Sequence, residues 1–216
     1  MNTYRTIDKK TWPRGELFDF YQKFANPCFN VSVSLEADNL YACSRDRNES
    51  FFLLALYAIL RAANAVPQLR QRILNDGAIV QFDRIAVMTP VMTDQEIFRQ
   101  IWCEYAPEFG AFSGDAAVKV EAAKKDAPSP MEEHGEDYFC ASCLPWLHFT
   151  AISQADFFFG QPAPILAWGK MKNGLIPVSC KFSHSFVDGL HASRFFGSIE
   201  DSFANPDSLW EAKTYA

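Results

Sequence analysis

Apolar and polar residues alternate along parts of the chain with the period of two that a half-buried strand requires. The clearest stretch is 29–35, where odd positions are apolar and even positions are polar. Apolar runs bounded by turn residues predict further strands over 78–83, 85–88, 138–143, 147–152, 165–171 and 175–182. Lys172-Asn173-Gly174 separates the last two runs, and Asn-Gly in that position predicts a hairpin.

Other stretches carry apolar residues three or four positions apart, which is the spacing of one helix face. Residues 14–24 follow this spacing up to the breaker pair Asn26-Pro27 and predict a short helix. Residues 50–66 are rich in Leu and Ala, which predicts a mostly buried helix that ends at Pro67. Further helices are predicted over 94–105, over 189–203 and, before a Pro-containing loop, at the start of 114–136. These elements predict a mixed α/β fold with a largely antiparallel core sheet.

The composition is that of an ordinary globular protein. Of the 216 residues, 49% are apolar and 21% are charged. Since no long linker interrupts the chain, residues 1–216 are predicted to form a single domain. The net charge is −6. This charge argues against nucleic acid as a partner, because the chain has no basic excess to neutralise a phosphate backbone.

The chain also lacks the sequence signals of export or membrane insertion. Its first 21 residues carry charges throughout and have no apolar core of a secretory signal. The longest strongly apolar stretch, 51–60, is too short to cross about 30 Å of hydrocarbon. Six scattered cysteines in a chain of this size fit reduced, mostly buried thiols. We therefore expect a cytoplasmic protein without a membrane span or a structural disulfide.

One short segment combines residue types that support acid–base chemistry. His184 lies at the end of a predicted strand, and Asp188 and Gly189 follow it within five residues. A neutral imidazole can take a proton from an alcohol, and a nearby aspartate can set its orientation. Glycine permits a positive φ or a close approach by a ligand or the backbone. A core histidine followed by a helix-capping aspartate would give the same pattern, so the segment alone leaves both interpretations open.

The wider sequence resembles a known family. Residues 184–196, HSFVDGLHASRFF, resemble the His-x-x-x-Asp-Gly signature of chloramphenicol acetyltransferases and of the acyltransferase cores of 2-oxo acid dehydrogenase complexes. Trp12-Pro13-Arg14 before Phe20-Tyr21 is similar to the opening of the chloramphenicol enzymes, which those cores lack. Similarity continues through 142–146 and 164–170 and covers essentially the whole chain. It implies a two-layer α/β sandwich, with helices packed on one side of the sheet, and a homotrimer with active sites at subunit interfaces.

The resemblance also implies roles for individual residues. His184 matches the general base, and Ser142 matches the hydroxyl that hydrogen-bonds the tetrahedral oxyanion. Asp188 and Arg14 match a buried ion pair that supports the site. Together with Gly189 they form the expected catalytic and supporting set.

Three further positions match substrate contacts of the family. Trp146 and Lys170 match residues that bind coenzyme A, and Tyr21 matches a wall of the acceptor pocket. The implied function is acetyl transfer from acetyl-CoA to the 3-hydroxyl of chloramphenicol, without a metal. Another small alcohol or thiol as acceptor remains an alternative, as does a trimeric binding protein that has lost turnover.

Several positions depart from the family pattern. Ala167 stands where the family has a threonine near the oxyanion, and Ser129 stands near a phenylalanine of the antibiotic pocket. Ser183 replaces a second histidine before His184. Phe52 and Met171 occupy positions of frequent cofactor-side tyrosines. These differences bear mainly on the identity of the acceptor.

Other candidate sites are better explained by packing. Cys140 and Cys143 form a Cys-x-x-Cys pair without a second ligand pair, and alternation along a strand points their thiols to opposite faces. His148 and His191 fit surface or hydrogen-bonded structural roles. The aromatic segment 156–160 fits packing under a neighbouring subunit, and Glu132-Glu133 has no matching acid for glycoside hydrolysis.

Overall fold

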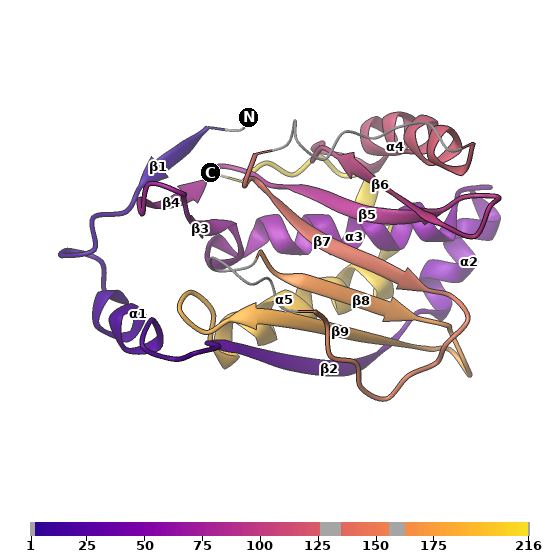
Figure 1. Ribbon diagram of the computed structural model, residues 1–216. Coiled ribbons are helices and arrows are strands. Elements are labelled where there is room, and N and C mark those ends of the chain that lie inside the picture. The colour runs from indigo at the N-terminus through magenta and orange to yellow at the C-terminus, as the bar shows by residue number, and fades with distance from the viewer. Residues whose placement is uncertain (1–2, 126–134, 156–162, 216) are drawn as a thin grey trace.

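The computed structural model describes residues 3–125, 135–155 and 163–215. In this part of the chain a six-stranded sheet forms the centre of the molecule (Figure 1). Its strands are, in spatial order, β2 (Cys28–Glu36), β9 (Leu175–Ser183), β8 (Ile165–Gly169), β7 (Tyr138–Leu144), β5 (Ala86–Met92) and β6 (Phe98–Cys103). β7 runs parallel to both β5 and β8, whereas the other neighbouring pairs are antiparallel. The predicted mixed sheet is therefore confirmed.

Helices cover one face of this sheet, which gives the predicted two layers (Figure 1). They are α2 (Asp38–Asp46), α3 (Phe51–Ala65), α4 (Phe109–Lys124) and α5 (Gly189–Ala204). Beyond one end of the sheet lie α1 (Gly15–Tyr21) and a small sheet of β1 (Tyr4–Thr6), β4 (Ile79–Phe82) and β3 (Gln71–Ile73). Short 3-10 helices span Pro67–Arg70 and Pro206–Trp210.

Alternation along the strands separates the core from the open face of the sheet. In β9, Ile176, Val178, Cys180 and Phe182 pack toward the helices. The intervening residues, which include Ser179 and Lys181, face the other side. Phe182 is fully buried in this core, and burying such a ring stabilises the fold by about 1.5–3 kcal/mol. The open face thus carries the shorter and more polar side chains.

The hairpin and most predicted elements are confirmed within a few residues. Asn173 and Gly174 both have positive φ, 52° and 78°, in the tight turn between β8 and β9. An isolated bridge between Lys172 and Leu175 closes this turn. A two-residue loop with two left-handed residues matches the twist of the flanking strands.

The helix predicted over 94–105 is wrong, because this segment forms a turn and then β6. Thr93 and Ile97 pair through a backbone hydrogen bond of 2.8 Å, and Glu96 adopts a positive φ of 60°. In β6, Ile101 packs into the helix-side core and Trp102 into a small cluster on the opposite side. Burial on both faces obscured the alternation from which a strand is recognised.

The strand predicted over 147–152 is also wrong, and α2 was missed. Residues 147–152 form no strand pairing; instead the carbonyl oxygen of Ile152 accepts hydrogen bonds from Asn30 and Ser179 on the open face. In α2, Leu40 and Cys43 supply the buried side. Two buried apolar residues are too few to produce a clear helical period in the sequence.

Candidate active site

His184 lies in a turn directly after β9, at the end of the sheet beside α1. Its backbone N–H donates to the carbonyl oxygen of Pro27 at 2.7 Å. The imidazole stacks on Tyr21 with ring centroids 4.1 Å apart and packs against Phe29 at 4.6 Å. Nε2 lies 3.2 Å from the Tyr21 hydroxyl, whereas Nδ1 is buried and has no hydrogen-bond partner among the described residues. Two aromatic rings thus fix the imidazole plane, with Nε2 facing a hydroxyl.

The guanidinium of Arg14 ties the start of α1 to this turn through three hydrogen bonds. Nη2 donates to the carbonyl oxygen of His184 at 2.8 Å, and Nε donates to that of Ser185 at 2.9 Å. Nη1 donates to Oδ2 of Asp188 at 2.8 Å, in an ion pair whose arginine side chain is 10% exposed. Because a guanidinium presents its donors in a rigid fork, these bonds define one position of the turn relative to α1.

Asp188 is the N-cap residue of α5, and His191 in the first turn completes the cap. Nδ1 of His191 lies 2.9 Å from Oδ1 of Asp188. Burial alone would raise the pKa of Asp188, but the hydrogen bond from Arg14 and the charges of His191 and Arg14 outweigh it and lower the pKa. Burial also lowers the pKa of His191, against the opposing effect of Asp188. Asp188 therefore stays ionised between two partners.

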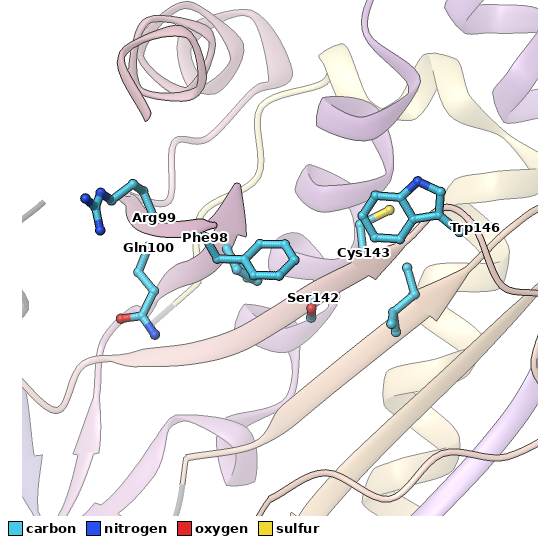
Figure 2. Close-up of a pocket in the computed structure, with 8 residues that line it drawn as sticks. Phe98, Arg99, Gln100, Ser142, Cys143 and Trp146 are labelled. Atoms are coloured by element: carbon cyan, nitrogen blue, oxygen red, sulfur yellow. The ribbon is translucent and has the colours of Figure 1, made fainter. Parts of the chain in front are cut away.

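Ser142 lies near the end of β7, on the face of the sheet opposite the helices. It opens into a pocket of about 490 Å³ (Figure 2). The pocket is lined by Pro90, Phe98, Arg99, Gln100, Ser142, Cys143, Leu144 and Trp146. Figure 2 shows the exposed rings of Phe98 and Trp146 on either side of Ser142. Aromatic walls with a few polar groups are typical of small-molecule sites.

Lys170 follows β8 and contacts the loop after β7 that carries Trp146. Its side chain is exposed, its backbone N–H donates to the carbonyl oxygen of Leu147 at 2.7 Å, and its carbonyl oxygen lies 2.9 Å from Nδ1 of His148. Gly169 permits this approach, since a Cβ there would collide with the Leu147 carbonyl oxygen. Trp146 and Lys170 are therefore on two loops that contact each other at the Ser142 end of the sheet.

The structure does not bring Ser142 and His184 together within one chain. Ser142 pairs with Ala167 and Ala167 with Ser179, so two strand spacings separate Ser142 from β9. His184 lies five residues beyond Ser179. Spacings of about 4.8 Å between strands and about 3.3 Å per residue place the Cα atoms of Ser142 and His184 roughly 19 Å apart. Neither side chain can span that distance.

The remaining candidate residues have structural surroundings. Cys140 packs with Trp102, whereas Cys143 packs against the helix-side core, so their thiols lie on opposite faces of β7. Burial raises the pKa of Cys140 to about 11 and that of Cys143 to about 12, which suppresses the reactive thiolate. None of the six cysteines, all of which are within the described ranges, forms a disulfide. Within the described ranges, no cluster of three or more His, Cys, Asp or Glu side chains is suited to a metal ion.

The positions that depart from the family pattern are mostly within the described residues. Ala167 is buried between Ser142 and Ser179 in the sheet. Phe52 stacks on Trp168 with centroids 5.7 Å apart. Ser183 is buried and Met171 is partly buried against the core. Ser129, Glu132, Glu133 and the segment 156–160 lie outside the described residues.

Gly189 begins α5 without the positive φ or the close backbone approach that the sequence suggested. Its φ is not positive, and apart from its chain neighbours and the adjoining backbone of α5, no atom of the described residues lies within 4 Å of the position a Cβ would take. The conformation of this chain therefore does not itself require glycine there. Glycine would be required at this position only if a ligand or a neighbouring subunit packed closely against it.

Sequence reasoning missed the pocket residues on β5 and β6. Pro90, Phe98 and Gln100 line the pocket of Ser142, but their segment was predicted partly as a helix. It also missed Gln22, whose Nε2 donates to Oγ of Ser185 at 3.0 Å beside His184. Correct recognition of β6 would have placed Phe98 and Gln100 on one face, because alternate residues of a strand share a face.

None of the described helices is long and apolar enough to span a bilayer. The described chain combines a mixed sheet with one helical layer, a histidine fixed at a strand end and a pocket that contains a serine. The sequence profile described as chloramphenicol acetyltransferase matches residues 1–200. The chain belongs to the chloramphenicol acetyltransferase family and is an acyltransferase.

Individual relatives agree with this assignment. The chain is 28% identical to chloramphenicol acetyltransferase 2 of Haemophilus influenzae over 207 residues, which cover 91% of this chain and 95% of the relative. It is similar to a solved chloramphenicol acetyltransferase with a TM-score of 0.84 and 29% identity, over 92% of this chain and 99% of that one. A dihydrolipoamide acetyltransferase of Azotobacter vinelandii shares the fold at a TM-score of 0.68 and 18% identity, over 89% and 87% of the two chains.

Proposed function

We propose that the protein is an acetyl-CoA-dependent O-acetyltransferase that acetylates the 3-hydroxyl of chloramphenicol, with His184 as general base. The observation that carries the proposal is the clamped imidazole, whose Nε2 already lies 3.2 Å from a hydroxyl oxygen, that of Tyr21. A general base must be within about 2.6–3.2 Å of the group it deprotonates. The acceptor is suggested by the names of the relatives.

The proposed reaction is one acyl transfer with two proton movements. Nε2 of His184 takes the proton of the acceptor hydroxyl as its oxygen attacks the acetyl carbonyl carbon. The hydroxyl of Ser142 donates a hydrogen bond to the tetrahedral oxyanion. When the intermediate collapses, the C–S bond breaks, and the thiolate of coenzyme A leaves and receives the proton from His184. Arg14 and Asp188 take no proton; they hold the turn that carries the imidazole.

Acetyl-CoA is the proposed acyl donor, held by Trp146 and Lys170. The Trp146 side chain is 57% exposed, which leaves its ring free to pack on a ligand. The Lys170 amine is exposed on the contacting loop and can approach the phosphates of the cofactor. Tyr21, which stacks on His184, is the proposed wall of the acceptor pocket. No metal takes part in this mechanism.

The active unit is proposed to be a homotrimer in which His184 of one copy faces Ser142 of the next. The support is geometric, because roughly 19 Å separate their Cα atoms in one chain, whereas both groups must contact the reacting carbonyl. The apolar surface of α1 fits a subunit contact. Leu17, Phe20 and Phe24 on and after this helix are each about half exposed, and a cluster of exposed apolar side chains marks an interaction site.

The first test measures thiol release from acetyl-CoA with chloramphenicol and with other alcohols and thiols. We expect release with chloramphenicol, and loss of nearly all of it in His184→Ala, while size-exclusion chromatography still shows the assembled protein. Ser142→Ala should lower kcat about tenfold to a thousandfold with little change in KM. Retained turnover in His184→Ala would refute the general-base role.

The same assay separates the alternatives. Release with other alcohols or thiols but not with chloramphenicol would assign a different acceptor to the same chemistry. Binding of acetyl-CoA without release for any acceptor would assign a non-catalytic binding protein. The ordered contacts of Arg14 around His184 favour an active enzyme, because a binding protein has no need to fix the imidazole.

A further inference from the structure

The pocket beside Ser142 contains a second polar group for which the proposed chemistry has no use. Gln100 lies on β6 and is paired in register with Pro90 on β5. The parallel register of β5 and β7, extended two residues beyond Met88 and Cys140, puts Pro90 beside Ser142. Gln100, Pro90 and Ser142 thus form one row across the open face of the sheet. Pro90 has no side-chain hydrogen-bonding group, so the row has polar ends and an apolar middle.

The oxygen of the Gln100 amide has no hydrogen-bond partner among the described residues. This atom, Oε1, is buried. A buried acceptor without a partner is costly, so native structures rarely retain one without a ligand or water to satisfy it. The amide can turn to present either oxygen or nitrogen, which lets it bind a donor or an acceptor.

The surroundings of this amide are suited to an organic ligand. In Figure 2 the ring of Phe98 lies between the Gln100 amide and Ser142, and Arg99 points away from Ser142. Two strand spacings place the Cα atoms of Gln100 and Ser142 about 10 Å apart. Consider an acceptor whose reacting group lies at Ser142 and whose remaining atoms pack along Phe98. Only a polar group several bonds from its reacting group could contact Gln100.

We propose that Gln100 selects acceptor alcohols that carry a second hydrogen-bonding group, a hydroxyl or an amide N–H, several bonds from the hydroxyl that is acetylated. The inference rests on the proposed function and names a specificity residue and a substrate class for that site. Gln100 is too far from the reacting carbon to take part in the chemistry. It therefore binds ground state and transition state equally, which affects KM rather than kcat.

The test compares wild type with Gln100→Leu, which keeps the volume and removes the amide. The acceptors are chloramphenicol, which has an amide N–H and a second hydroxyl, and its analogues lacking either donor. Diols of increasing length, each paired with the mono-alcohol of the same length, extend the series. We expect wild type to prefer the acceptor with the donor about tenfold to a hundredfold in kcat/KM for at least one pair, and Gln100→Leu to lose this preference through KM. Gln95→Leu, in the exposed turn before β6, is the matched control and should keep it.

The outcomes are distinct. An unchanged preference in Gln100→Leu, or no preference in wild type, overturns the role of Gln100 while turnover itself upholds the proposed function. An equal loss for all acceptors, or a change of oligomeric state on size-exclusion chromatography, also overturns it and makes Gln100 a structural or interface residue. Absence of thiol release with every acceptor refutes the proposed function, and the inference with it. Gln100→Met repeats the test if the leucine variant does not fold.

Discussion

Because His184 and Ser142 are far apart within one chain, we predict that variants lacking one or the other will restore activity when they assemble together. His184→Ala is expected to lose nearly all turnover, and Ser142→Ala to lose about tenfold to a thousandfold in kcat. When they are unfolded together in equal amounts and refolded, a site between copies regains both groups wherever an intact His184 faces an intact Ser142. In a closed trimer with random mixing this occurs at about a quarter of the interfaces, so about a quarter of the wild-type rate should return.

The assay is thiol release from acetyl-CoA with the best acceptor, at equal total protein. A matched experiment refolds wild type with the double variant. A shared site again predicts about a quarter of the wild-type rate, whereas a site within one chain predicts about half. Mixing the folded single variants without unfolding controls for subunit exchange. If the refolded single variants give no more than the mean of their separate rates, the shared site is refuted.

Two further predictions concern the clamp around His184. Arg14→Met removes three hydrogen bonds from a nearly buried guanidinium. Because Asp188 is partly exposed and can rehydrate, we expect a loss of about 3 kcal/mol and a Tm lower by about 6–12 °C. Arg45→Met on the exposed side of α2 is the control, and a Tm shift no larger than the control's would contradict the clamp. The second prediction is a pH effect. The lowered pKa of His191 means that the unfolded chain takes up a proton more readily as the pH falls below about 6.5, so this residue reduces stability on acidification. His191→Gln should therefore flatten the fall of the urea midpoint between pH 7 and 5, and an unchanged slope would count against a partly buried, largely neutral His191.

The elements with a single strong period could be predicted from the sequence. The buried helix α3, the alternating strand β2 and the Asn173-Gly174 hairpin have local signals that agree with their final environment. The segment that forms β6 was misread, because its apolar residues are divided between two clusters on opposite faces of the sheet. Which face a side chain occupies depends on strand neighbours that are distant in sequence.

The candidate site divides in the same way. His184 and Arg14 could be singled out because the motif and the N-terminal opening are contiguous in sequence. Gln100 could not be singled out, because its place in the Ser142 pocket depends on how β5, β6 and β7 pair with one another. The distance between Ser142 and His184 likewise follows only from the strand order, so the resemblance to the family, rather than the pattern of this chain, suggested a shared site.

The hydrogen bonds of Arg14 have a consequence for co-translational folding. They join residues that are 170 to 174 positions apart in the sequence, so the turn at His184 is fastened only when both ends of the chain have met. Contacts of such separation form late, because loop closure must precede them. A nascent chain whose residues 184–188 have not yet left the ribosome therefore lacks every described partner of the Arg14 guanidinium, and its N-terminal helix cannot yet fasten the turn that carries the imidazole.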